Sequence, residues 1–390
     1  MADIANIDAA FGFSRNRNIE TAVKEASIQI RSKVSFSKIE LCLILFTASR
    51  EKVKNLAYEV KRVLNPKTVV GYHCPLLIVD RSIYEYGLTV IAFSGMEIVS
   101  GITPVTAESE DSERFILRLL RGTKYRRKSF CLFFSALSYD SVKSFSSGIE
   151  RGLGRNFPFL NVFSCRELSN PFIVYNENIF SNVSAGIVLF DDVRIYLDVK
   201  SGFSPLGKGW EATSFKNNIV EEINNKPAVD FYRHYFGEKA VSSDNYFARV
   251  SRRYPLGFKT KGASRYSIAM PLSVTEEGGL VFLKNIPSDE LKLMISTKEA
   301  LANTLKESAE NLKKNNSASK IALLFDSFFR YKFFGRGYPR QLVSAKEVLG
   351  DIPLVGGVSF YSSGVESLDK LELGHSIFEH SYSLLGVGSG

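Results

Sequence analysis

The most constraining feature of this sequence is an internal repeat marked by cysteines. "CLILFTASREKVKNLAYEVKRVLNPKTVVGYHC" runs from Cys42 to Cys74, and "CLFFSALSYDSVKSFSSGIERGLGRNFPFLNVFSC" runs from Cys131 to Cys165. Each stretch begins with a short apolar run, continues with the apolar spacing of a helix, and ends with a second short apolar run. A repeat of this size fixes the unit of architecture before any single element is assigned.

A third copy of the unit lies near the C-terminus, starting with an apolar run at Lys320 and closing with another at Phe360. A helical pattern precedes each of the copies, and one more strand-like run follows each of them. The unit therefore reads helix, strand, helix, strand, loop, strand, repeated along the chain.

The order of elements within the unit predicts how its strands pair. A strand, a crossover helix and a second strand favour parallel pairing with a right-handed connection, and we expect the closing strand to return antiparallel. We predict an α/β (mixed α+β) fold in which these units form mixed sheets covered by helices, in two lobes. Residues 1–225 would form a domain with two units; residues 226–390 would form a second domain with a β-rich insert and the third unit.

Composition and charge narrow the class of protein. With 45% hydrophobic and 23% charged residues, the chain is typical of a globular protein, and no apolar run is long enough to predict membrane insertion. The four cysteines contain no CxxC pair, so we expect no disulfide framework and a cytoplasmic location. The net charge is +9, and basic residues are concentrated in residues 121–128 and 249–265. Because no nucleic-acid-binding module accompanies these runs, we favour solvated loops over a nucleic-acid or anionic-lipid patch.

Laid out in order, these segments resemble the FIST family of sensory proteins, which carry paired N- and C-terminal FIST domains. The matching stretches are "FGFSRN", "TVVGYHC" and "GLTVIAFSG", followed by "INNKPAVDFYRHYFG", "RRYPLGF", "ALLFDSFFR" and "DIPLVGGVSFY". The resemblance covers nearly the whole chain. It implies an intracellular small-ligand-binding module of signal transduction, with amino acids as proposed ligands and with haem and nitric oxide sensing in some members.

The resemblance also implies a partner protein. Family members signal to kinases, cyclases or chemotaxis receptors. The matching segments leave no stretch of sequence for such an output domain, so we expect a stand-alone sensor that signals to a separate partner of that kind. The sequence departs from the family pattern in three places. Ser327 stands where a cysteine is common, Ser362 lies where a Gly-Glu pair is usual, and Glu379 lies where a His-Asn-type element is usual. These departures bear on which ligand is bound.

Candidate ligand-binding residues follow from the repeat, because ligands of open α/β sheets bind beyond the carboxyl ends of parallel strands. The hydroxyls that open each helix could be simple N-caps or, together, a cradle for a carboxylate or phosphate. The arginines could clamp an anion bidentately. The candidates are Thr47, Ser49, Arg50, Tyr72, His73, Cys74, Ser135, Ser138, Cys165, Arg166, Asp326, Ser327, Arg330, Ser359 and Tyr361.

Other functions remain as alternatives. His73 could ligate haem iron, with Cys74 as the rival ligand, although a lone histidine is more often structural, so we expect no cofactor. No zinc-ligand spacing is present. The sequence has no GxSxG elbow, P-loop or GxGxxG motif, so we predict no catalytic residues and no enzyme activity. Two further alternatives are a protein-interaction scaffold, which would have no enclosed pocket, and an enzyme of unknown class, which would need a nucleophile and a base within hydrogen-bond reach.

Overall fold

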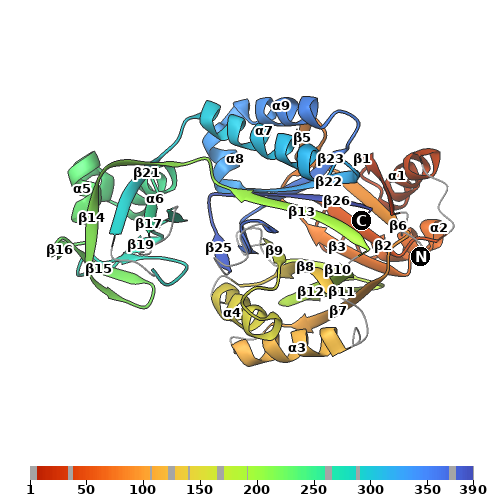
Figure 1. Ribbon diagram of the computed structural model, residues 1–390, viewed down its shortest axis with the longest axis horizontal. Coiled ribbons are helices and arrows are strands. Elements are labelled where there is room, and N and C mark those ends of the chain that lie inside the picture. The colour runs from red at the N-terminus through yellow and green to blue at the C-terminus, as the bar shows by residue number, and fades with distance from the viewer. Residues whose placement is uncertain are drawn as a thin grey trace.

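The computed structural model describes residues 7–33, 38–105, 108–121, 128–138, 141–164, 171–190, 192–259, 266–286, 290–368 and 375–389. In this structure three six-stranded sheets and their helices form a body, and a β-rich lobe projects from one side of it (Figure 1). The predicted mixed α/β fold in two lobes is confirmed. In the described part of the chain, no helix has the length and apolarity needed to cross a membrane.

Three units of the same element order make up the body: a strand, a helix, a strand, one or two helices, a strand, a hairpin and a closing strand. The first unit contains β1 (Asp8–Ser14), α1 (Ile19–Lys33), β2 (Leu41–Phe46), α2 (Leu56–Leu64), β3 (Thr68–His73), β4 (Leu77–Val79), β5 (Ser82–Tyr84) and β6 (Leu88–Ser94). The second contains β7 (Ile98–Pro104), α3 (Ser109–Arg121), β8 (Lys128–Ala136), α4 (Ser141–Leu153), β9 (Phe159–Ser164), β10 (Phe172–Tyr175), β11 (Asn178–Ser181) and β12 (Val183–Phe190). The third contains β13 (Val193–Lys200), α7 (Lys298–Asn315), β22 (Ser319–Ser327), α8 (Phe328–Phe334), α9 (Pro339–Leu349), β23 (Leu354–Ser359), β24 (Tyr361–Gly364), β25 (Ser376–Phe378) and β26 (Tyr382–Ser389).

Strand pairing within each unit is as the sequence predicts. The two strands joined by a helix are parallel in every unit: β2 with β3, β8 with β9, and β22 with β23. The closing strands β6, β12 and β26 pair antiparallel with the first strand of each pair. The sequence pattern did not reveal the opening strands β1, β7 and β13, nor the hairpins.

The hairpins are exchanged between units in a closed cycle. Hairpin β4–β5 of the first unit extends the third unit's sheet at β23, and β10–β11 of the second extends the first unit's sheet at β3. Hairpin β24–β25 of the third unit extends the second unit's sheet at β9. Every sheet of the body is therefore completed by another unit.

The inner faces of the body's sheets meet in one apolar core. Tyr72 of β3, Phe134 of β8 and Phe325 of β22 are buried there, one from each sheet. The ring centroids of Tyr72 and Phe134 lie 5.2 Å apart, and those of Phe134 and Phe325 lie 5.6 Å apart. Helices cover the outer faces through separate apolar clusters. The place where the sheets face one another is thus filled by side chains.

The lobe is an insertion between β13 and α7, the position where the other units have a direct connection. Its strands and helices are β14 (Ser204–Lys216), β15 (Ile219–Ile223), β16 (Lys226–Pro227), α5 (Asp230–Phe236), α6 (Asp244–Arg253), β17 (Leu256–Lys259), β18 (Ser267–Ala269), β19 (Ser273–Val274), β20 (Leu280–Val281) and β21 (Glu290–Ile295). They enclose an apolar cluster of their own. The boundary predicted at residues 225 and 226 falls inside this lobe, between β15 and β16.

Candidate functional site

The predicted site residues of the third unit lie in a buried polar network. Arg330 has no exposed surface; its Nε donates to Asp326 Oδ1 at 2.8 Å, and its guanidinium also donates to the Ser201 carbonyl. Tyr338 donates its hydroxyl to the other Asp326 oxygen at 2.8 Å. Ser327 Oγ donates to the Glu379 carbonyl at 2.6 Å and accepts from the Phe329 amide. These side chains join β22, α8 and α9 to the chain that enters the lobe.

Hydroxyls of the first and second units also have partners within the protein. The Ser135 hydroxyl is buried and lies 2.8 Å from both Asn161 Oδ1 and Ser184 Oγ. Ser138 Oγ lies 2.9 Å from Ser141 Oγ at the start of α4, and Thr47 Oγ1 accepts from the Gly87 amide. In the third unit, Ser359 of β23 and Tyr361 of β24 are also buried.

The residues considered for haem are enclosed by protein. The His73 ring lies against Phe172 and Phe46, with centroid distances of 5.2 Å and 5.7 Å, and burial lowers the pKa of this imidazole. Burial raises the pKa of the Cys74 thiol, so Cys74 is held as the thiol, the weaker metal ligand. His73 and Cys74 line none of the cavities described below. The described surroundings of His73 and Cys74 do not fit a haem.

The remaining predicted residues are at the surface or outside the described residues. Arg50 is exposed and donates to Ser181 Oγ at 2.6 Å, which ties the exchanged hairpin β10–β11 to the first unit. Ser49 is exposed beside it. Cys165 and Arg166 lie outside the described residues. The described candidates line none of the three cavities beside the lobe and do not line a fourth cavity between β7 and α3, so their role in ligand binding stays a prediction.

A cavity lies where the lobe meets the body, and Lys284 is one of its lining residues. This "Lys284 cavity" measures about 250 Å³ and adjoins a smaller one of about 80 Å³; both are lined by Lys284, Ser267 and Ile377. Lys284 Nζ donates to Ser267 Oγ in the lobe and to the Ile377 carbonyl in the body, each at 2.9 Å. An ammonium has three donors, so one remains for a ligand.

Glu379 of the body lines the smaller cavity and is 1% exposed. Its Oε2 accepts from the Met270 amide of the lobe at 2.6 Å, while its Oε1 is buried without a hydrogen-bond partner. Burial raises the pKa of Glu379 to about 7, with the Lys284 charge acting in the opposite direction. Burial likewise lowers the pKa of Lys284, against the charges of Glu379 and Glu366. Buried polar atoms in native proteins almost always have a partner, so the Oε1 atom indicates a ligand or water.

The raised pKa of Glu379 predicts a pH-dependent stability. Its pKa is about 7 in the folded protein and 4.5 as its ordinary value, so the folded state holds a proton that the unfolded chain releases between these pH values. The stability that this proton contributes is present below pH 4.5 and is lost as pH rises through 7. We expect Glu379→Gln to match the wild type at pH 4.5 and to exceed it by up to about 3 kcal/mol at pH 7.5. Urea denaturation at both pH values checks this; a difference that does not change with pH would contradict it.

Sequence reasoning did not select Lys284 or Glu379 as ligand-binding residues. Lys284 stands within the apolar stretch "GGLVFLKNI", where an isolated cation is unusual, and this was the available signal. Glu379 was noticed only as a departure from a family pattern. Their hydrogen-bond partners Ser267, Met270 and Ile377 come from two segments about a hundred residues apart, so no local spacing marks the site. The described residues contain no group of three or more side chains that could hold a metal ion.

The fold and this cavity define a repeat-built mixed α/β protein with a small polar site between body and lobe. The sequence model described as FIST N domain matches residues 40–226, and that described as FIST C domain matches residues 228–364. The chain belongs to the FIST family, whose domains are generally small-ligand-binding domains of sensing and signal transduction. The predicted family is confirmed.

The solved structures described below are distantly similar to this chain. No curated protein sequence matches the chain. Among solved structures, a cyanuric acid hydrolase described as an innovation by structural concatenation is 9% identical with a TM-score of 0.37, covering 99% of this chain and all of that one. A chorismatase is 8% identical with a TM-score of 0.36, covering 99% of both chains. A cyanuric acid hydrolase from A. caulinodans is 8% identical with a TM-score of 0.38, covering 98% of this chain and 99% of that one.

Proposed function

We propose that this protein is a sensor that binds a free amino acid in the Lys284 cavity and signals to a separate partner protein. The observation that carries the proposal is the pair of opposite charges at one cavity, Lys284 and Glu379, each with hydrogen-bonding capacity that the protein does not fill. The two side chains do not form a direct ion pair. A ligand that carries both a negative and a positive charge can therefore form hydrogen bonds with Lys284 and Glu379 at the same time.

An amino acid fits this arrangement in charge and in size. Its carboxylate would accept from the Lys284 ammonium, a charge-assisted hydrogen bond of the stronger kind. Its ammonium would donate to Glu379 Oε1, and such an ion pair favours the ionised carboxylate. The larger cavity, with Ser363 and Ser376 among its lining residues, would hold the side chain. Its volume of about 250 Å³ favours a small, polar amino acid.

The position of the cavity would let binding produce a signal. Ser267 and Lys284 belong to the lobe, whereas Ser363 and Glu379 belong to the body, so the ligand would contact both parts. A ligand that makes contacts only when the parts are together stabilises that arrangement and shifts the population toward it. A kinase, cyclase or chemotaxis component could then read the position of the lobe. In this mechanism the amino acid is bound and released without chemical change.

Calorimetric titration against the common amino acids tests the proposal. We expect a small set of polar amino acids to bind and their decarboxylated or deaminated analogues to bind more weakly. Lys284→Met and Glu379→Gln should each weaken binding by about tenfold or more, since each removes a charge-assisted hydrogen bond. The ligand should be recovered unchanged after incubation with the protein.

Lys298→Met is the matched control, because this exposed lysine at the start of α7 lines none of the cavities. It should leave affinity unchanged. Circular dichroism establishes that each variant is folded before binding is compared. A panel with no binding, or full affinity in a folded Lys284→Met variant, would contradict the proposal.

A further inference from the structure

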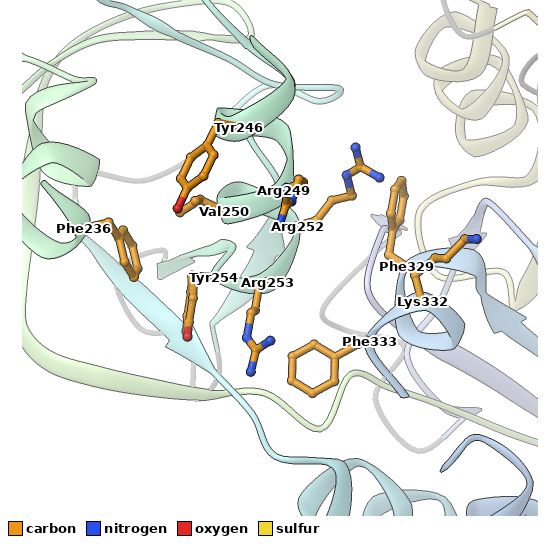
Figure 2. Close-up of a pocket in the computed structure, with 10 residues that line it drawn as sticks. All are labelled: Phe236, Tyr246, Arg249, Val250, Arg252, Arg253, Tyr254, Phe329, Lys332 and Phe333. Carbon is orange, nitrogen blue, oxygen red and sulfur yellow. The ribbon is translucent and has the colours of Figure 1, made fainter. Parts of the chain in front are cut away.

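A second cleft between lobe and body has a different character from the Lys284 cavity. It measures about 550 Å³ and lies between α6 of the lobe and α8 of the body. Figure 2 shows Arg252 and Arg253 extending from α6 toward Phe329 and Phe333 of α8. We call it the arginine cleft; its lining residues include the cations Arg249, Arg252, Arg253 and Lys332 and no carboxylate.

The cations of the arginine cleft have no acidic partners among the described residues. All four side chains are exposed, and no described carboxylate forms an ion pair with any of them. Elsewhere in the lobe, by contrast, Arg233 pairs with both Asp230 and Glu238. Like charges gathered at one site destabilise the fold unless an anion joins them. The positive charge of the cleft therefore favours the binding of a negatively charged group.

Aromatic rings provide the second half of the site. Phe236, Tyr254 and Phe333 are half-buried around the cleft, and the ring centroids of Phe236 and Tyr254 lie 4.7 Å apart. The Arg253 guanidinium lies over both Tyr254 and Phe333, at 5.9 Å and 5.6 Å from the ring centroids. Rings and guanidinium planes are the surfaces on which planar bases stack. A ligand with both an anionic group and a flat ring system could thus bind the arginines and the aromatic rings at the same time.

We infer that the arginine cleft binds a mononucleotide, with its phosphate on the arginines and its base against the aromatic rings. Arginine suits phosphate because its planar fork donates two parallel hydrogen bonds. The volume of about 550 Å³ lies within the range of small-molecule sites, which are about 300–1,000 Å³. The site shares no lining residue with the Lys284 cavity, so it is independent of the proposed amino-acid ligand.

The cleft also has a direct structural link to the body. His380, next to Glu379, lies with its Nε2 at 2.8 Å from the Arg252 carbonyl, and its ring stacks on Phe329 at 5.2 Å. Burial lowers the pKa of His380 to about 4, so this histidine is neutral at pH 7 and adds no charge to the cleft. These contacts of His380 link α6 of the lobe to α8 of the body.

Titration calorimetry with adenosine and guanosine 5′-monophosphates tests this inference on the whole chain. We expect binding that weakens with rising salt and that exceeds the affinity for inorganic phosphate and for adenosine by about tenfold each. Arg253→Gln and Lys332→Gln should each weaken nucleotide binding by about tenfold. Arg336→Gln is the matched control, because Arg336 is an exposed cation just after α8 that does not line the cleft.

Several outcomes would overturn the inference. One is inorganic phosphate binding as tightly as the monophosphates, which would show an anion site without base recognition. Another is unchanged nucleotide affinity in the folded Arg253→Gln variant. A third is a short single-stranded oligonucleotide that binds much more tightly than either monophosphate, which would assign the cleft to nucleic acid.

Discussion

Replacing Arg330 with methionine should lower the free energy of unfolding by about 3–5 kcal/mol, the usual cost of removing one member of a buried ion pair. The substitution leaves the Asp326 carboxylate buried with only Tyr338 and Gln341 as donors. It also removes the guanidinium that lies 4.8 Å from the centroid of the Tyr382 ring. Urea denaturation followed by circular dichroism gives the free energy directly.

Two further variants sharpen this result. Arg330→Met combined with Asp326→Leu should recover much of the lost stability, because replacing a whole buried pair with apolar groups is often neutral. Arg340→Met, an exposed arginine on α9, should stay within about 0.5 kcal/mol of the wild type. A stable Arg330→Met variant that has lost amino-acid binding would instead support the ligand role that the sequence predicted for Arg330.

A fragment of residues 1–226, the N-terminal family domain and the residues before it, should fail to fold cooperatively. It lacks β23, which pairs with β4, and it lacks β24 and β26, which pair with β9 and β13. The fragment would therefore expose three strand edges and much of the shared core, and we expect no sharp thermal transition and strong binding of a hydrophobic dye.

Co-expression with residues 227–390 is the matched test of this explanation. The two fragments together can form every interunit pair, so they should purify as a complex with a cooperative transition. A monomeric 1–226 fragment that unfolds sharply on its own would contradict the role of the exchanged hairpins.

Local patterns predicted the repeated part of this fold well. Residues such as Val60 and Val142 recur at helical spacing, and the apolar runs at Leu41–Phe46 and residues 321–325 are buried on both faces. The opening strand Asp8–Ser14 was missed because its sequence, DAAFGFS, contains no β-branched residue and is rich in small ones, which are not typical of strands. The hairpin exchange could not be predicted, because β4 pairs with a strand more than two hundred residues away, and periodicity contains no information about distant partners.

The candidate site was harder to predict than the fold, for a physical reason. The sequence argument placed ligands at strand ends of the repeat, but residues such as Ser135 and Arg330 are already satisfied by buried protein partners. The Lys284 cavity instead forms where the symmetry is broken, between the inserted lobe and one side of the body. Only the three-dimensional structure brings Lys284 to Glu379.

The place of the lobe in the chain has a consequence for engineering. Its two ends lie together, since Ser296 Oγ donates to the Gly202 carbonyl at 2.6 Å, so the body tolerates a long excursion at this joint without any break in its sheets. The equivalent joint between β1 and α1 spans only Arg15 to Asn18 and lies away from the lobe. A foreign domain with adjacent termini could therefore be inserted between β1 and α1 without disturbing the lobe.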